Sequence, residues 1–337
     1  MTYASTEAKT KLKRPPYDPE LAVIRDSFPP FGPITNELII AHHEDPTLYG
    51  PLPSVSDLIK GRPIVHKKCE ITGFKTDDPP IILSIFSPAS SDNIPRPCVY
   101  FMHGGGMIFL NRHVGLEQPL DWVIETGCVL ISVEYRLGPE DPQPAALHDC
   151  YAGLCWVHSH ADTLYVDRDR IMVAGHSGGS GLAAGIALFA RDQHGPAICA
   201  QLLACPMIDD RNKSVSCRQF EDEEPWDRKS NIAAWAAVLE HRGNDYGRDV
   251  SPYFAPARAI DLGGLPTAWI DVGSTDVFRD EAVSYASRLW EAGVQAELHV
   301  WPGGFHGFDM MAPNSALGKK AIQSKMDWVK NIFRVQI

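Results

Sequence analysis

The sequence predicts an α/β fold: a mostly parallel sheet of eight strands with helices on both faces. Five of the strand-like segments are nearly continuous apolar runs: Val99-Tyr100-Phe101, Val129-Leu130-Ile131, Ile171-Met172-Val173, Leu202-Leu203-Ala204 and Ala268-Trp269-Ile270. Strands that are apolar on both faces are typical of a parallel sheet buried between two layers of helices. Helical patterns separate these segments, and this alternation indicates a doubly wound sheet.

The predicted elements follow one another regularly along the chain. Strands are expected near residues 64–73, 80–86, 97–102, 128–133, 170–174, 200–206, 267–272 and 295–301. Helices are expected between them at residues 117–126, 145–160, 179–193, 281–292 and 315–333. Asp18 as N-cap and Pro19 as first helical residue predict where an earlier helix begins.

One stretch does not fit the alternation. Residues 208–262 contain no convincing strand, while a helical pattern covers residues 229–241. Because this insertion is too long for a simple crossover, we expect a helical excursion over one end of the sheet. The expected organisation is a flexible tail (1–16), an N-terminal lid segment (17–60), an α/β domain (61–207 and 263–337) and a lid insertion (208–262).

Composition and charge exclude several classes of function. The chain has 337 residues, is 44% hydrophobic and carries a formal net charge of −11. No basic surface would neutralise nucleic-acid phosphates or dock on an acidic membrane. No run reaches the roughly 18 apolar residues of a transmembrane helix, and the polar N-terminus does not resemble a secretory signal. The eight cysteines form no C-x-x-C pair, so we expect free thiols, no metal site and a reducing, cytoplasmic location.

The strongest chemical signal is the pentapeptide Gly175-His176-Ser177-Gly178-Gly179, a G-x-S-x-G pattern. It comes directly after one predicted strand and begins the next predicted helix. A serine on such a sharp turn projects its hydroxyl into a cleft, and the flanking glycines let other backbones approach closely. The pattern predicts Ser177 as a nucleophile, although a merely structural tight turn would need the same small residues.

A glycine-rich loop, His103-Gly104-Gly105-Gly106, follows an earlier predicted strand. Ligands bind at the carboxyl ends of strands in open α/β sheets. Backbone N–H groups in such a loop can point at a developing oxyanion. The loop therefore predicts an anion-stabilising element near Ser177.

An acid and a base follow two later strands. Asp276 and His306 give the chain order Ser, Asp, His, which is expected when the nucleophile turn comes first. The nearest rivals are Asp271 and His299, which lie within predicted strands, and Asp280, which is better placed as the N-cap of the next helix.

Together these motifs resemble the hormone-sensitive-lipase-like branch of the α/β-hydrolases, microbial carboxylesterases marked by H-G-G-G and G-D-S-A-G-G. The segments Tyr135–Glu140 and Asp276–Glu281 are similar to the family's Y-R-L-A-P-E and D-P-L-R-D-E stretches, and the resemblance spans about residues 60–335. It implies the α/β-hydrolase fold with a helical cap formed by the two lid segments. It also implies a serine carboxylesterase for small to medium acyl esters that needs no cofactor.

The resemblance also assigns roles to residues. Ser177 would be the nucleophile, Asp276 the acid and His306 the base. The oxyanion hole would consist of the backbone N–H groups of Gly105, Gly106 and Gly178. Three positions depart from the family pattern, since His176 replaces an acid, Gly178 an alanine and Ser180 a glycine.

An apolar substrate pocket is expected beside these groups. Its predicted walls are Met107, Ile108, Trp226 and Phe308, although packing between cap and sheet would explain the same side chains. The tail (1–16) and the exposed cap surface could also mediate a homodimer. Acyl length and the natural substrate are not encoded in any motif that we recognise.

Several alternative functions fit individual motifs of the sequence. Residues 179–184 fit the dinucleotide-binding pattern G-x-G-x-x-A, but position 199, where an acid is expected, is cysteine. His158 and His160 lack a nearby third ligand for zinc. A hydrolase of a lactone, amide or carbamate on the same triad stays open. A non-catalytic receptor on this fold is disfavoured because His306 is retained.

Overall fold

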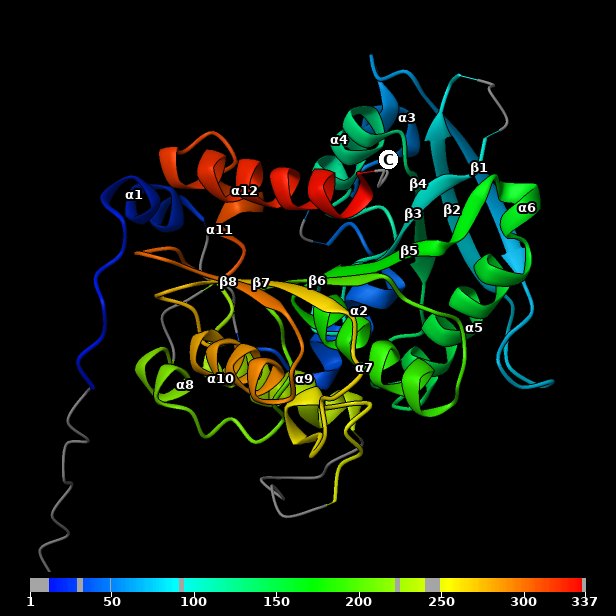
Figure 1. Ribbon diagram of the computed structural model, residues 1–337. Helices are drawn as coiled ribbons and strands as arrows, with labels where there is room; N and C mark the ends of the chain where they lie inside the picture. The colour runs from blue at the N-terminus through cyan, green and yellow to red at the C-terminus, as the bar shows by residue number, and fades with distance from the viewer. Residues whose placement is uncertain are drawn as a thin grey trace, which may run out of the picture.

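The computed structural model describes residues 12–28, 33–48, 50–90, 94–221, 225–239 and 249–334 (Figure 1). Most of the predicted tail, residues 1–11, lies outside these ranges. Its described end is packed against the rest of the chain. The Gln219 side chain donates to the Lys13 carbonyl at 2.5 Å, and the Arg14 guanidinium lies 5.7 Å from the centre of the Phe220 ring.

One eight-stranded sheet forms the centre of the molecule, in the order β1-β2-β4-β3-β5-β6-β7-β8. Strand β2 pairs antiparallel with β1 and β4, and the other pairs are parallel. The strands are β1 (Ile64–Ile71), β2 (Ile81–Pro88), β3 (Arg96–Met102), β4 (Val129–Glu134), β5 (Val166–His176), β6 (Ala200–Ala204), β7 (Thr267–Gly273) and β8 (Ala296–Trp301). The predicted fold class and all eight predicted strands are confirmed.

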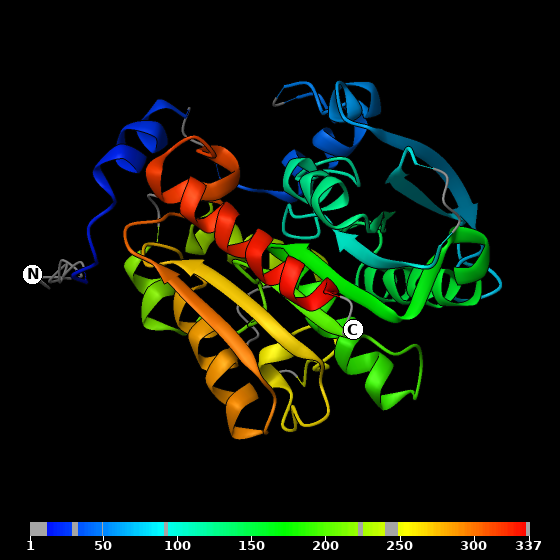
Figure 2. The same ribbon diagram turned by 45° about the horizontal axis from the view of Figure 1, so that its top comes forward.

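Helices cover both faces of the sheet (Figure 1). On one face lie α3 (Val55–Ile59), α4 (Glu117–Thr126) and α12 (Ala316–Phe333), and on the other lie α5 (Ala145–Ser159), α7 (Gly178–Asp192) and α10 (Arg279–Glu291). Figure 2 shows α12 lying across the parallel part of the sheet. Alternate residues of one strand therefore enter different cores: Val99 packs on the α4–α12 side, whereas Tyr100 packs on the α5–α7 side.

The N-terminal lid segment contains α1 (Pro19–Ser27), α2 (Asn36–Glu44) and α3. Asp18 caps α1 as predicted, since its carboxylate accepts the N–H groups of Glu20 and Leu21. Leu21 is buried against Phe305 and Phe308, so α1 packs beside α11 (Phe308–Met311) and α12. Only α2 among these three helices contributes to the main cavity described below.

The described residues of the insertion 208–262 form short helices joined by coil, and none of them lies in a strand. The insertion contains α8 (Val215–Gln219), α9 (Arg228–Val238) and the short 3-10 helix η1 (Pro256–Arg258), while residues 222–224 and 240–248 lie outside the described ranges. The remaining helix, α6 (Ala161–Leu164), connects α5 to β5. Within the described part of the chain, no helix has both the length and the apolarity to cross a bilayer.

Candidate active site

Ser177 lies on the sharp turn between β5 and α7. Its backbone has φ 55° and ψ −118°, a conformation that non-glycine residues rarely adopt. The turn is fixed on both sides, because the Ser177 N–H donates to the Ala204 carbonyl and the Ser177 carbonyl accepts the N–H of Ser180. A side chain at Gly179 would lie 2.1 Å from the Met102 carbonyl oxygen, so only glycine allows β3 to approach here. The strained turn directs the Ser177 hydroxyl towards the end of the sheet.

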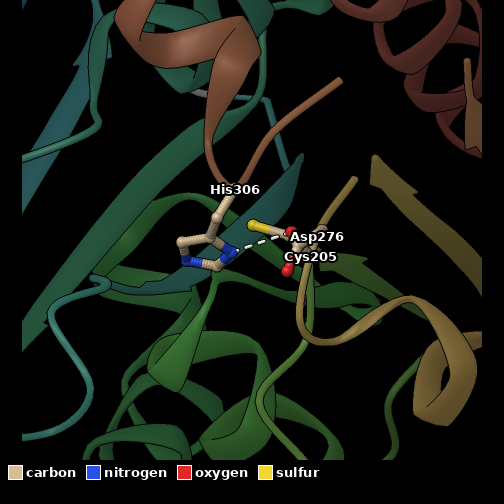
Figure 3. A group of neighbouring side chains, drawn as sticks. All are labelled: Cys205, Asp276 and His306. Atoms are coloured by element: carbon tan, nitrogen blue, oxygen red, sulfur yellow. Dashed lines mark hydrogen bonds and ion pairs between the residues drawn. The ribbon is translucent and has the colours of Figure 1, made fainter. Parts of the chain in front are cut away.

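Ser177, His306 and Asp276 form a continuous hydrogen-bonded chain. The Ser177 Oγ lies 2.9 Å from His306 Nε2, and His306 Nδ1 lies 2.9 Å from Asp276 Oδ2. Because an ionised carboxylate only accepts hydrogen bonds, Nδ1 carries the proton and Nε2 is left to accept the serine hydroxyl. Asp276 is fully buried, and its other oxygen accepts the Phe278 N–H at 2.9 Å. The structure therefore brings together the three residues that the sequence singled out; Figure 3 shows the His306–Asp276 half of this chain.

The rival residues are occupied elsewhere. Asp271 accepts the Trp301 indole N–H at 3.0 Å, and His299 is stacked between Trp269 and Trp301. Asp280 is not the N-cap that we expected, because that position is taken by Phe278. The Asp280 carboxylate lies in the first turn of α10 and accepts the Ser216 N–H.

The glycine-rich loop packs directly against the serine turn. A side chain at Gly178 would lie 3.0 Å from Gly106 Cα and 2.9 Å from the Met107 nitrogen. The loop needs several left-handed residues, with φ 96° at Gly105, 63° at Gly106 and 61° at Met107. This close approach places the backbones of Gly105, Gly106 and Gly178 beside one another, as an oxyanion hole requires.

His103 anchors the beginning of this loop. Its ring stacks on Tyr135 with 4.2 Å between ring centres, and the Tyr135 hydroxyl donates to the His103 carbonyl at 2.7 Å. Complete burial lowers the pKa of His103 to about 3, so the ring is neutral. Tyr135, the first residue of the Y-R-L-G-P-E segment, thus holds the beginning of the glycine-rich loop in place through these two contacts.

The unusual residue His176 lies directly beside the site. Its Nε2 is 3.3 Å from the Cys205 thiol, and its ring centre is 5.9 Å from that of His306. Burial lowers the pKa of His176 to about 3, so this position, where the resembling family has an acid, is uncharged here. Another of the three departures, Ser180, uses its hydroxyl to donate to the Ala204 carbonyl at 2.8 Å.

A cavity of about 310 Å³ opens in front of Ser177 and His306. Its apolar walls come from α2 and the segment before it, the glycine-rich loop, the cap insertion and α11: Ile34, Leu38, Phe109, Leu110, Val114, Pro225, Trp226, Met310 and Met311. His42 from α2 also lines it, and burial lowers the pKa of this histidine. The cavity is therefore a small apolar chamber with few polar groups beside the nucleophile.

Of the four predicted pocket residues, only Trp226 lines this cavity. Met107 and Ile108 are buried in the core, because the left-handed backbone of the glycine loop turns them away and presents Phe109 and Leu110 instead. Phe308 belongs to the core around α1. The sequence did not lead us to expect that α2, Met310 and Met311 line the cavity. For the two methionines, their closeness to His306 along the chain could have indicated it.

Cys205 lies beside the acid–base pair (Figure 3). Three atoms that could each bind a metal ion lie within 4.8 Å of one another, one each from Cys205, Asp276 and His306. Burial and neighbouring carboxylates raise the pKa of the Cys205 thiol well above its ordinary value, so the metal-binding thiolate is disfavoured. His306 and Asp276 are hydrogen-bonded to each other, so this group fits a triad packed against a neutral thiol better than a metal centre.

Comparison with known proteins agrees with this geometry. A family model described as the alpha/beta hydrolase fold matches residues 99–310. Esterase LipI of Mycobacterium tuberculosis is 35% identical, over 72% of this chain and 76% of its own length. Carboxylesterase NlhH of the same species is 32% identical over 88% of this chain and 90% of its own. A solved bacterial heroin esterase superposes with a TM-score of 0.85 at 33% identity, covering 95% of this chain and 98% of its own.

Fold, motifs and relatives thus define a hydrolase built on one strained serine turn. The chain belongs to the α/β-hydrolase family, in the carboxylesterase branch that its H-G-G-G and G-x-S-x-G motifs predicted.

Proposed function

We propose that the chain is a serine carboxylesterase that hydrolyses small to medium acyl esters of apolar character. The observation that carries this proposal is the hydrogen-bonded chain from Ser177 through His306 to Asp276, which ends in an apolar cavity. A volume of about 310 Å³ is at the lower end of the usual range for ligand pockets. The esterase and carboxylesterase relatives support the same reaction class.

The reaction follows from the geometry. His306 Nε2 takes the Ser177 hydroxyl proton as Oγ attacks the ester carbonyl carbon, and Asp276 stabilises the resulting imidazolium. The negative charge on the carbonyl oxygen is held by the N–H groups of Gly105, Gly106 and Gly178. His306 then donates the proton to the leaving alcohol. Water, deprotonated by His306, attacks the acyl-enzyme and releases the acid and the free Ser177.

Hydrolysis of p-nitrophenyl esters from acetate to palmitate tests the proposal. We expect turnover to peak at short or medium chains and Ser177→Ala to abolish it, while Ser159→Ala, which changes an exposed serine at the end of α5, retains it. A peak at palmitate would contradict the small pocket. A folded protein without turnover at any chain length would contradict the carboxylesterase, and lactones, amides and carbamates would then be tested in turn. Binding of such a compound without turnover would instead indicate a receptor.

The remaining sequence predictions become part of this proposal. The cap would consist of residues 17–60 and 208–262, of which α2 and the segment at Pro225 and Trp226 line the cavity. A cytoplasmic location is supported by the eight cysteines, all of which are free thiols. Light scattering during size-exclusion chromatography would test the homodimer, for which a mass of twice 37.2 kDa is expected.

A further inference from the structure

A buried ion cluster lies between α12 and the segments that carry the catalytic histidine and acid, and its members do not line the main cavity. The Lys325 side chain, on α12, is only 3% exposed. Its Nζ contacts the Asp309 carboxylate directly and lies 3.4 Å from Asp271 Oδ2. Two neutral donors complete the cluster, since Gln118 of α4 donates to Asp309 and Trp301 donates to Asp271, each at 3.0 Å.

The two carboxylates sit on the segments that carry the acid and the base. Asp271 is in β7, five residues before Asp276, and Asp309 is in α11, three residues after His306. These segments are also joined to each other, because the Thr275 hydroxyl donates to the Gly304 carbonyl at 2.7 Å. They therefore form one unit, and Lys325 docks that unit onto α12.

Ser177 belongs to a different part of the fold. It is held between β5 and α7 by bonds to Ala204 and Ser180. The distance from Ser177 Oγ to His306 Nε2 depends on how the unit bearing His306 sits against the rest of the protein. Lys325 and Gln118 supply that attachment from two helices on the α4–α12 face.

Lys325 and Asp309 stabilise each other's charge, whereas burial raises the pKa of Asp271. Asp309 and Asp271 raise the pKa of Lys325 against the effect of burial, and Lys325 holds the pKa of Asp309 below its ordinary range. Buried ion pairs are seldom favoured over apolar packing for stability alone, but removing one partner leaves an uncompensated charge. Such a cluster tolerates little displacement, which suits an anchor.

We propose that Lys325 is a positioning residue, an inference that rests on the proposed function. By its contacts with Asp309 and Asp271, Lys325 fixes the unit that carries His306 and Asp276. The position of this unit relative to Ser177 is thereby set. A second, small cavity of about 20 Å³, lined in part by His176, Gln118, Asp309 and Lys325, shows how close the cluster comes to the serine turn. Lys325 contacts neither the substrate cavity nor the triad atoms.

The test compares Lys325→Met with Lys330→Met. Lys330 is on the same helix and pairs with Glu125 at 2.5 Å on the surface. A displacement of about 1 Å at a catalytic group costs roughly a hundredfold in rate. We therefore expect Lys325→Met to lower kcat by about a hundredfold with KM within about twofold, and Lys330→Met to leave both unchanged. The rates are measured well below the unfolding temperature and divided by the concentration of sites titrated with a fluorophosphonate.

Variants of Asp309 give an independent measurement if Lys325→Met does not fold. Asp309→Asn keeps an oxygen for Lys325 and Gln118, so we expect kcat within about threefold of the parent. Asp309→Leu removes both contacts and should lower kcat about a hundredfold, the loss expected for a misplaced catalytic group. A lowered Tm with unchanged kcat per titrated site in Lys325→Met or Asp309→Leu would overturn the proposal, because that is the result for a purely stabilising cluster.

The rate of fluorophosphonate labelling of Ser177 separates this inference from the proposed function. Labelling needs the activated serine but no ester. A parent protein that is labelled but hydrolyses no ester would contradict the carboxylesterase. The ratio of labelling rates between parent and Lys325→Met would still test the anchor, and equal rates would contradict it.

Discussion

The two sides of His306 differ in polarity. In front, the cavity of about 310 Å³ is walled by apolar side chains and by two histidines, His42 and His176, whose pKa values are lowered by burial. Behind, Lys325 joins two buried carboxylates. His176, Gly115 and Met310 line both the front cavity and the small second cavity, so these three residues lie between the two environments.

The difference shows where this fold can keep charge. An ionised side chain in the front cavity would lose its water whenever an apolar ester entered, at a cost of several kcal/mol. The same charges behind His306 are permanently paired and never meet the substrate. Substrate binding is thus proposed for the apolar cavity, and positioning of His306 for the buried ion cluster.

The largest effect is expected at Asp276, the acid that is hydrogen-bonded to His306. Asp276→Asn would remove the charge that stabilises the His306 imidazolium and disturb its tautomer, so we expect kcat to fall about ten-thousandfold. Ester hydrolysis by the purified variant measures this. The control is Asp280→Asn, which should retain most activity because Asp280 bonds Ser216 instead. A loss of less than tenfold in Asp276→Asn would mean that another acid supports His306.

The next effect concerns the glycine-rich loop, whose backbone N–H groups are proposed to hold the oxyanion. A side chain at Gly105 would lie 2.3 Å from the Phe109 carbonyl oxygen, at a backbone φ of 96°. Gly105→Ala should therefore displace an oxyanion donor and lower kcat by about a hundred- to a thousandfold.

The matched control is Gly61→Ala. Gly61 has φ 74°, but nothing lies within 4 Å of the added methyl group. It carries a similar backbone strain without the collision, so kcat should not change. Equal loss of kcat in both variants would show that general strain, and not the oxyanion loop, is responsible.

A smaller effect is expected at the apolar front wall. Trp226 lines the cavity, whereas Met107 is buried in the core. Trp226→Ala should raise KM for p-nitrophenyl butyrate about tenfold and move the preferred acyl chain to greater length, because pocket contacts of this kind are worth about 1–3 kcal/mol. Met107→Leu, a swap of similar volume, should leave the chain-length profile unchanged. A changed profile in Met107→Leu alone would reverse our assignment of the wall.

The last prediction concerns His176 and the pH dependence of the free energy of unfolding. The pKa of His176 is about 3 in the folded protein, against 6.5 as its ordinary value. Between these pH values the unfolded chain binds more protons, so stability is fully present above pH 6.5 and falls as the pH drops. The contribution is at most about 1.4 kcal/mol of unfolding free energy per pH unit.

Urea unfolding at pH 7, 6 and 5 measures this dependence. His176→Gln should make the loss of stability with acidification shallower than in the parent. The control is His299→Gln, at a position on β8 where the ring stacks on Trp269 and Trp301. An unchanged slope in His176→Gln would mean that His176 is not held neutral in the folded state.

Much of this architecture could be predicted because it is encoded locally. Apolar runs such as Ile171-Met172-Val173 predict buried strands even when the neighbouring strands are not known. Ser177, Asp276 and His306 could each be found because a chemically suitable residue follows a strand end. The cavity walls could not be found in this way, since a left-handed turn at Met107 decides which neighbouring side chains face the substrate.

The strands of the sheet, their order along the chain and the three residues of the hydrogen-bonded triad could all be read from the amino-acid sequence. Long-range packing was needed to show that α2 lines the cavity, that Phe308 does not, and that Lys325 is buried near the site. The physical reason is distance along the chain. Lys325 belongs to a helix whose other lysines face solvent, and only the approach of Asp271 and Asp309 from separate segments makes its burial possible.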